Sequence, residues 1–324
     1  MAAIYLGVDT GATKSEALIA NDQGHVLGYG RFGPGNWENV GWHGARSVLQ
    51  TIIQQALEAT GATIAEISAS GLGLAGYDWP EDHAPHMVML REIGLKGSIT
   101  LVNDAVPGLI AGAPAGWGVV ISAGTSCNSY GRDAQGRYGR MTGDSRFGEY
   151  AGASELVQYA LQAVSRAWSM RGPQTRLGRS FVEAAGAKDV DDLLAGLVRG
   201  RYHVHAGHAR LVFETAAAGD GVAREAVDWA GRQLGDLGLG VIRQLDLAGQ
   251  AFDVVLSGSL YRGSPRLQTC IRDVITAEAP GARIRRLTVP PVTGGVLLAM
   301  EADSLETASL HPALLQSIAG VIEP

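Results

Sequence analysis

The sequence opens with an apolar run that leads into an acidic, hydroxyl-rich turn. Residues 4–8 have the length and composition of a β-strand, and residues 15–20 offer a second one, so the turn between them is predicted to be a hairpin tip. This tip exposes backbone N–H groups and hydroxyl donors, Lys14 adds a positive charge, and Asp9 supplies an oxygen that suits hydrated Mg²⁺. The tip is therefore typical of a phosphate and magnesium site, with an ordinary surface hairpin as the alternative.

The Asp-Thr-Gly triplet at this tip is also how an aspartic protease presents its carboxylate. Such an enzyme needs two aspartates that face each other. The chain has no second Asp-Thr-Gly or Asp-Ser-Gly, and it contains long segments of helical periodicity that an all-β protease would lack. We therefore do not expect a protease.

Strands and helices alternate after the opening hairpin. The pattern predicts strands at residues 24–31, 67–74 and 98–102, and helices at 43–60, 84–93 and from about 104 to 111. This order indicates an α/β fold with a mixed sheet and helices on both faces.

The small and rigid residues 112–116 predict a boundary between two domains. Beyond it, strands at 119–122, 126–130 and 137–141 repeat the opening three-strand pattern. Further helices are predicted at 153–168, 222–245, 265–278 and 294–300, and further strands at 252–256 and 284–289. The expected domains are residues 1–113 with about 304–324, and residues 114–303, so that a last helix at 305–322 packs back on the first domain.

Composition excludes several classes of protein. The 324 residues are 46% hydrophobic, enough to fill two cores, and the net charge of −6 argues against nucleic acid or an anionic membrane as a partner. Cys127 and Cys270 form neither a metal-binding pair nor a disulfide framework, and no apolar run has the length of a membrane span. With no signal-peptide pattern at the start, we expect a cytoplasmic location.

Four loops share a pattern in which a strand end is followed by small residues, a hydroxyl or a carboxylate. They are residues 9–14, 103–104, 122–126 and 257–259. In this order they resemble the sugar kinase, hsp70 and actin ATPase superfamily, and within it the N-acetylglucosamine kinase and BadF/BadG/BcrA/BcrD ATPase family. The resemblance implies two ribonuclease-H-like domains of the actin and hexokinase type, with mixed sheets flanked by helices, that bind ATP and Mg²⁺ in the cleft between them.

The resemblance also implies roles for individual residues in nucleotide binding. Asp9 matches the residue that holds Mg²⁺ through water, and Gly258 matches the adenosine motif, where a glycine lets the nucleotide approach the backbone. The residues that match the two phosphate loops are Gly11, Thr13 and Lys14 in the first, and Gly124, Thr125 and Ser126 in the second.

Asp104 matches the catalytic aspartate of these kinases. Phosphoryl transfer needs positioning, Mg²⁺, donors on the phosphates, and a carboxylate that deprotonates the acceptor hydroxyl. Aspartate between a strand and a helix is also a favoured helix N-cap, which is the alternative for Asp104. The other three loops of the pattern favour the interpretation of Asp104 as the catalytic base.

Positions that contact the sugar in the amino-sugar kinases match Asn36, Trp37, Gly76, Asp104, Tyr138 and Asp144. The carboxylate of Asp144 could hold sugar hydroxyls, with a surface Gly-Asp turn as its alternative. The family usually carries Gly-Asp-Glu-Gly-Ser where this chain has residues 143–149, with a short insertion that displaces the glutamate. Sugar specificity is therefore left open.

The expected activity is transfer of the γ-phosphoryl group of ATP to the 6-hydroxyl of N-acetylglucosamine, a small-molecule partner. Glucosamine is the alternative acceptor, and a homodimer is also considered. Two other classes are less favoured. An iron–sulfur ATPase activator of an acyl-CoA dehydratase needs cysteines that bridge a cluster, and a non-catalytic sugar or nucleotide sensor would lack the base at Asp104.

Two further motifs compete with this interpretation. Residues 71–76 have the glycine spacing of a dinucleotide fingerprint, but Pro80 stops the helix that should follow. His203, His205 and His208 could be metal ligands, yet no carboxylate or cysteine has a matching spacing. We expect an exposed loop there.

Overall fold

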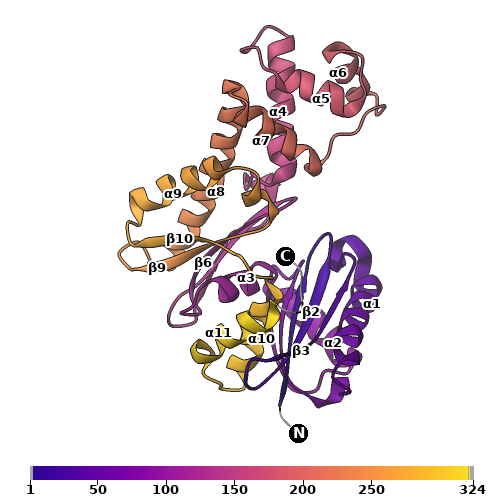
Figure 1. Ribbon diagram of the computed structural model, residues 1–324, viewed down its shortest axis with the longest axis vertical. Coiled ribbons are helices and arrows are strands. Elements are labelled where there is room, and N and C mark those ends of the chain that lie inside the picture. The colour runs from indigo at the N-terminus through magenta and orange to yellow at the C-terminus, as the bar shows by residue number, and fades with distance from the viewer. Residues whose placement is uncertain (1–2, 320, 322–324) are drawn as a thin grey trace.

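The computed structural model describes residues 3–319 and 321, which contain two five-stranded mixed sheets in separate halves of the molecule (Figure 1). The first sheet has the order β3-β2-β1-β4-β5. Its strands are β1 (Ile4–Thr10), β2 (Ser15–Asn21), β3 (Val26–Phe32), β4 (Ile67–Leu74) and β5 (Ser98–Asn103). Strands β1, β2 and β3 are antiparallel neighbours, whereas β4 and β5 run parallel to β1, as the predicted mixed sheet requires.

The second sheet repeats this arrangement with the order β10-β9-β6-β7-β8. Its strands are β6 (Gly118–Ala123), β7 (Cys127–Arg132), β8 (Tyr138–Arg140), β9 (Phe252–Ser257) and β10 (Ala282–Arg286). Three antiparallel strands are again followed by two parallel ones, so the predicted repetition of the opening pattern is confirmed. Strand β10 ends at Arg286, three residues before the predicted end.

The helices cover the sheets and also extend beyond the second one. They are α1 (Trp37–Glu58), α2 (His83–Ile93), α3 (Ala105–Gly112), α4 (Ala153–Trp168), α5 (Leu177–Ala185), α6 (Val190–Val198), α7 (Ala209–Ala217), α8 (Gly221–Gln244), α9 (Pro265–Glu278), α10 (Val292–Ala302) and α11 (Thr307–Ile318). Short 3-10 helices are η1 (Ile64–Glu66), η2 (Pro80–Asp82), η3 (Ser145–Phe147), η4 (Ala206–His208) and η5 (Ser259–Arg262). None of the helices in the described part of the chain is long and apolar enough to cross a membrane.

Helix α1 shows how the sequence pattern produces one outer layer. It begins after Asn36, whose Oδ1 accepts a hydrogen bond from the Glu38 backbone N–H at 2.9 Å and so caps the helix. Its apolar side chains recur every three or four residues and are buried with those of β1, β2 and β4, so one face of the first sheet is closed.

Helices α3 and α10 lie between the two sheets and share a core with side chains from both. Helix α10 packs on the first sheet, although the sequence predicted that residues 294–300 complete the second domain. The reason is local: a Cβ on Gly7 would lie 2.4 Å from the Val296 backbone N, and one on Gly71 would lie 2.2 Å from the Gly295 carbonyl oxygen. Because these two strand positions carry no side chain, the helix can approach the sheet closely.

Helix α11 packs back beside β3, as predicted, where the hydroxyl of Ser317 accepts a hydrogen bond from the Val26 backbone N–H at 2.8 Å. The predicted segment 305–322 runs past the helix end at Ile318 and partly into residues outside the described part. The domain limits themselves stay a prediction.

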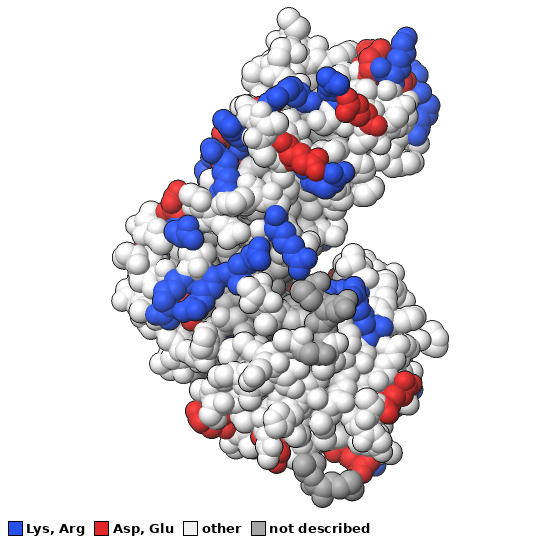
Figure 2. Space-filling model, in the orientation of Figure 1, with Lys and Arg blue, Asp and Glu red and all other residues white. Residues whose placement is uncertain are grey.

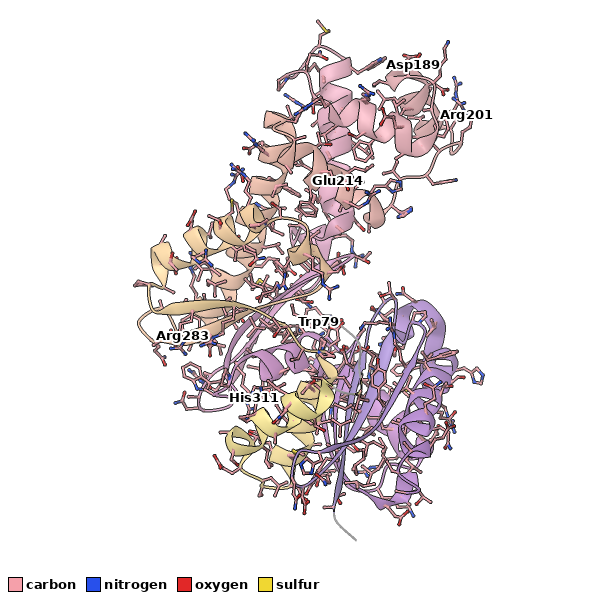
Figure 3. All side chains as sticks on the ribbon, in the orientation of Figure 1. Trp79, Asp189, Arg201, Glu214, Arg283 and His311 are labelled. Carbon is pink, nitrogen blue, oxygen red and sulfur yellow. The ribbon has the colours of Figure 1, made fainter. Side chains whose placement is uncertain are left out.

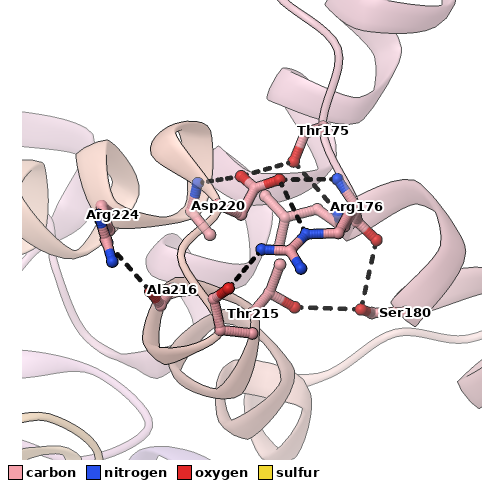
Figure 4. Close-up of polar contacts among 10 residues, drawn as sticks. Thr175, Arg176, Ser180, Thr215, Ala216, Asp220 and Arg224 are labelled. Atoms are coloured by element: carbon pink, nitrogen blue, oxygen red, sulfur yellow. Dashed lines mark hydrogen bonds and ion pairs between the residues drawn. The ribbon is translucent and has the colours of Figure 1, made fainter.

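Helices α4 to α7 form a projection above the second sheet, and of these the sequence predicted only α4 (Figure 1). The projection is joined to α8 through the buried carboxylate of Asp220 (Figure 4). This carboxylate accepts hydrogen bonds from the Ala223 backbone N–H at 2.8 Å, the Arg176 backbone N–H at 2.8 Å and the Thr175 hydroxyl at 3.0 Å. One side chain therefore caps α8 and holds the segment before α5.

Candidate active site

The surface is indented where the two halves meet, and we call this indentation the notch (Figure 2). The parallel strands β1, β4 and β5 end at one edge of the first sheet. The β1–β2 hairpin is confirmed: Thr10 pairs with Ser15, and the Gly11 backbone N–H donates to the Lys14 carbonyl at 2.9 Å. Thr13 and Lys14 are exposed at the tip. The Lys14 ammonium lies 2.8 Å from Oε2 of the buried Glu16, so this cation is held beside the loop.

Asp9 lies on β1 directly opposite Glu16 of β2 and in register with Gly73 of β4. Its side chain is half-buried, and burial is the main reason that its pKa is raised well above the ordinary value of 3.8. The charges of Asp104 and Glu16 raise this pKa further, while Lys14 opposes them. A carboxylate that lacks enough positive charge around it fits the binding of a cation.

Asp104 lies between the end of β5 and the start of α3, and its Cα is 3.3 Å from the Cβ that Gly73 would carry. The side chain of Asp104 makes no capping hydrogen bond. The helix is capped instead by Asn103, whose Oδ1 accepts from the Ala105 backbone N–H at 2.9 Å. Asp104 thus occupies the N-cap position of α3, as the alternative predicted, but its side chain does not make the capping hydrogen bond. Burial, together with the charge of Asp78, raises the pKa of Asp104 to about 7.

The second predicted phosphate loop, residues 124–126, joins β6 to β7, with Thr125 and Ser126 exposed. The first amides of α4 hold this loop, because Ala153 N–H donates to the Gly124 carbonyl at 2.9 Å and Ser154 N–H to the Thr125 carbonyl at 3.0 Å. The loop therefore lies at the positive end of a helix dipole.

Gly258 follows β9, next to β6, and has a φ of +112°. A Cβ there would lie 2.2 Å from the Ala123 carbonyl oxygen, so only glycine lets the two strand ends come this close. The structure thus brings Gly258 to the second phosphate loop. Helix α3 connects this pair to Asp104, because a Cβ on Gly108, four residues after Asp104, would lie 3.0 Å from the Ser257 hydroxyl oxygen.

A cavity of about 510 Å³ adjoins Gly258, and the sequence did not predict it. It is lined by residues of η5 and α7, together with residues of η4 and the start of α4, with Phe213 offering an apolar face and Arg210, Glu214 and Arg262 polar groups. Glu214 is labelled in Figure 3. The volume suits a small organic ligand. The cavity was missed because α7 itself was not predicted.

Three of the predicted sugar-binding residues lie together on the first half. The indole N–H of Trp37 donates to the Gly76 carbonyl at 2.7 Å. Gly76 has a φ of +79°, and a Cβ there would lie 2.8 Å from Oδ1 of Asn36, so this contact also requires glycine.

Tyr138 and Asp144 are not part of that group. Tyr138, on β8, lines a separate cavity of about 350 Å³ with Trp79 and Arg140. Asp144 caps η3 and holds the Arg146 guanidinium in its own loop, with its Oδ2 2.5 Å from Nη2. Their predicted contact with sugar stays a prediction.

Several polar side chains beside Asp104 were missed by sequence reasoning. Asp78 accepts a hydrogen bond from Nδ2 of Asn103 at 2.8 Å, and Tyr130 and Arg140 of the second sheet reach the same loop. The signal that could have found Asp78 is its place four residues after the end of β4, among aromatic residues. Its partners could not be found, because they come from distant parts of the chain.

The competing motifs are settled by the structure. Residues 71–76 lie in β4 and the turn after it, so their glycines do not open a helix and the fingerprint interpretation fails as expected. His203 and His205 are exposed, and His208 is half-buried beside His205, as expected of a surface loop. Within the described residues, no group of three or more histidine, cysteine, aspartate or glutamate side chains is arranged to hold a metal ion.

Comparison with known proteins adds to this geometry. The model of the BadF/BadG/BcrA/BcrD ATPase family matches residues 6–299. An N-acetylmuramic acid/N-acetylglucosamine kinase from Clostridium acetobutylicum is 26% identical over 297 residues, which are 91% of this chain and 97% of that protein. An N-acetyl-D-glucosamine kinase from Dictyostelium discoideum is 26% identical over 313 residues, 92% of this chain and 98% of that protein.

Among solved structures, one described as an N-acetylglucosamine kinase from Chromobacterium violaceum has the same fold. Its TM-score is 0.64 with 23% identity, and the match covers 92% of this chain and 99% of that one. The predicted two-domain fold of the actin and sugar-kinase type is confirmed.

Proposed function

The chain belongs to the BadF/BadG/BcrA/BcrD ATPase family, and from this premise we propose that it transfers the γ-phosphoryl group of ATP to the 6-hydroxyl of N-acetylglucosamine. The observation that carries the proposal is the half-buried carboxyl of Asp104, which makes no capping hydrogen bond and lies close enough to Asp9 for its charge to raise the pKa of that residue. Two relatives named as N-acetylglucosamine kinases, each matched over more than nine-tenths of its length, support the choice of acceptor.

Asp104 is the proposed general base. A base works best when its pKa lies near the working pH, and burial places that of Asp104 at about 7. When ionised, it would accept the proton of the sugar hydroxyl as that oxygen attacks phosphorus. The charge of Asp78 beside it favours the acceptance of that proton.

The nucleotide would bind across the notch. The hairpin residues Gly11, Thr13 and Lys14 would hold its phosphates from one side, and the loop of residues 124–126 from the other. We assign the 510 Å³ cavity to the adenosine. Gly258 lies at its edge and has no side chain, so the nucleotide can approach the backbone there. Asp9 would hold Mg²⁺ through water, and the ion would neutralise phosphate charge during transfer.

The sugar would contact Asn36, Trp37 and Gly76, which the structure holds together, and Asp104. Tyr138 and Asp144 are the predicted contacts from the other half, and Asp144 would have to release Arg146 to reach a sugar. Glucosamine stays the alternative acceptor because the loop at residues 143–149 differs from the family pattern.

An iron–sulfur activator is disfavoured by the state of both thiols. Burial raises the pKa of Cys127 to about 12 and that of Cys270 to about 11, so neither is a ready thiolate ligand. A cytoplasmic location and a homodimer stay predictions.

The test is a coupled assay of ADP release with N-acetylglucosamine, glucosamine, N-acetylmuramic acid, N-acetylmannosamine and glucose in turn. We expect the highest kcat/KM with N-acetylglucosamine, and Asp104→Asn should abolish most turnover while ATP binding persists. ADP release that no sugar stimulates, or an Asp104→Asn variant with wild-type kcat, would overturn the proposal.

A further inference from the structure

The loop after β4 contacts both sheets at the point where the base is positioned. Asp78, in this loop, accepts a hydrogen bond from Nδ2 of Asn103 at 2.8 Å, and Asn103 directly precedes Asp104. The other end of the Asn103 amide accepts from the Ala105 backbone N–H at 2.9 Å. The amide is therefore fixed at both ends, and with it the backbone that carries Asp104.

The second sheet holds the same loop from the other side. The guanidinium of Arg140, on β8, donates to the backbone carbonyl of Asp78 and lies 4.3 Å from the centre of the Trp79 ring. Trp79 lies between the two halves (Figure 3). The hydroxyl of Tyr130, on β7, lies 3.5 Å from Oδ1 of Asp78, at the long limit of a hydrogen bond.

The carboxylate of Asp78 is poorly compensated for a purely structural group. It is half-buried, it takes part in none of the ion pairs among the described residues, and Arg140 donates to its backbone oxygen. Burial, with the charges of Glu38 and Asp82, raises its pKa to about 6, although the charge of Arg140 and the hydroxyl of Tyr130 oppose the shift. An acid kept under these conditions costs stability, so its contact with Asn103 calls for a role at the site.

We propose that Asp78 is a positioning residue for the base Asp104, acting through the amide of Asn103, and that Arg140 makes this position depend on the second sheet. The inference rests on the proposed function, because it takes Asp104 as the base. Its consequence is that Asp104 is correctly placed for phosphoryl transfer only while Arg140 of the second half contacts the loop after β4.

The first experiment compares Asp78→Ala with Asp78→Asn. We expect Asp78→Ala to lower kcat by about 10²-fold, because small misplacements of a reacting group cost that much, with KM for ATP within about twofold of wild type. Asp78→Asn keeps an oxygen that accepts from Asn103, so it should restore kcat to within about threefold. Wild-type kcat in Asp78→Ala would overturn the proposal. So would an Asp78→Asn variant as impaired as Asp78→Ala with a raised KM for the sugar, which would mean that the carboxylate itself binds sugar.

The second experiment tests the part of Arg140 with a double-mutant cycle. Arg140→Ala should lower kcat about tenfold in the wild-type background and less than twofold in Asp78→Ala, because without the Asp78 carboxylate the hold of Arg140 on the loop no longer reaches Asn103. Independent effects that simply multiply would overturn the coupling. Arg137→Ala is the matched control, since among the described residues the Arg137 guanidinium bonds only Asp133 within its own turn, and the change should leave kcat unchanged.

These outcomes separate the inference from the function on which it rests. A wild-type protein without sugar-dependent ADP release overturns both. An active wild type, with an inactive Asp104→Asn variant and a fully active Asp78→Ala variant, overturns the positioning role alone. Urea unfolding of every variant shows whether a lost activity comes from a lost fold.

Discussion

Buried carboxyl groups behave differently in two regions of this molecule. At the candidate active site, burial raises the pKa of Asp9, Asp78 and Asp104, and none of these side chains takes part in an ion pair among the described residues. Away from the notch, the pKa values of Asp220 and Asp253 are lowered although burial opposes the shift. Backbone amides of Arg176 and Ala223 stabilise the charge of Asp220, and the guanidinium groups of Arg283 and Arg285 stabilise that of Asp253.

The difference shows that burial alone does not mark a functional acid. Asp253, on β9, is more buried than Asp104, yet Arg283 and Arg285 lie 2.9 and 2.7 Å from its Oδ1. Its charge is satisfied within the fold, whereas that of the carboxyls at the notch is left for a ligand to satisfy. The comparison predicts opposite effects of mutation in the two regions.

The largest expected effect is on turnover by Asp104→Asn. The amide cannot accept the proton of the sugar hydroxyl, so kcat should fall by about 10²- to 10⁴-fold. Stability measured by urea unfolding should not decrease, because the change removes an uncompensated charge. Asp253→Asn is the control from the other region and should show the reverse, with kcat within about twofold and a lower free energy of unfolding. An Asp104→Asn variant that is stable and has wild-type kcat would contradict the inference that the uncompensated carboxyl group serves the reaction.

The next effect is on stability at Asp220. Asp220→Ala removes the cap of α8 and leaves the buried amide of Ala223 and the part-buried amide of Arg176 without their acceptor, at a cost of about 3 kcal/mol in the free energy of unfolding. Asp189→Ala removes an exposed cap, that of α6, and should cost only about 1 kcal/mol. Equal losses in the two variants, measured by urea titration, would show that burial of the network adds nothing.

The third effect is a pH dependence with opposite signs in the two regions. The folded-state pKa of Asp104 lies above its ordinary value of 3.8, so its contribution to stability is complete below that value and is lost as pH rises through about 7. The free energy of unfolding of Asp104→Asn should therefore equal that of wild type near pH 4. At pH 8 it should be higher than that of wild type by about 1–2 kcal/mol, after allowance for the partial exposure of Asp104.

For Asp220 the sign reverses, because its folded-state pKa is lowered. Its contribution is present above 3.8 and is lost as pH falls through the folded value. The destabilisation by Asp220→Ala should thus shrink in acid. Urea unfolding from pH 4 to pH 8 measures both trends. If the difference in unfolding free energy from wild type changed with pH in the same direction for both variants, the opposite pKa shifts of Asp104 and Asp220 would be contradicted.

The smallest effect is at Ala151, a buried residue before α4 whose φ is +115°. A side chain in this region strains the backbone, so Ala151→Gly should raise the free energy of unfolding by about 1 kcal/mol. Thermal unfolding would measure it. A destabilised variant would show that packing of the methyl group outweighs the strain.

Much of the fold could be predicted because the responsible signals are local. The opening hairpin, the two repeated strand patterns and the position of Asp104 at a strand end follow from apolar periodicity and turn residues. Helices α5 to α7 were missed, although Asp189 stands at the cap position of α6, because each has only nine residues and so gives a weak periodic signal.

The rest depends on contacts between distant residues. Helix α10 follows a strand of the second sheet, which suggests that it packs there. It packs on the first sheet because Gly7 and Gly71 lack side chains that would collide with it, and these glycines are distant in sequence. The contact of Arg140 with Asp78 is likewise formed across 62 residues of sequence. A grouping such as Asn36, Trp37 and Gly76 was accessible only through family resemblance, which supplied the correspondence that spacing could not.

The placement of α3 and α10 also governs how the two halves can move. Within the described residues the chain passes between the sheets along two routes, one through residues 104–117 and the other through residues 287–291. The first contains Gly116 and leads into Gly118 at the start of β6, both at positive φ, whereas the second contains two consecutive prolines, Pro290 and Pro291. Because proline fixes φ, the second connection resists a change of backbone dihedral angles, so a rotation of one half against the other would have to be absorbed mainly near Gly116 and Gly118.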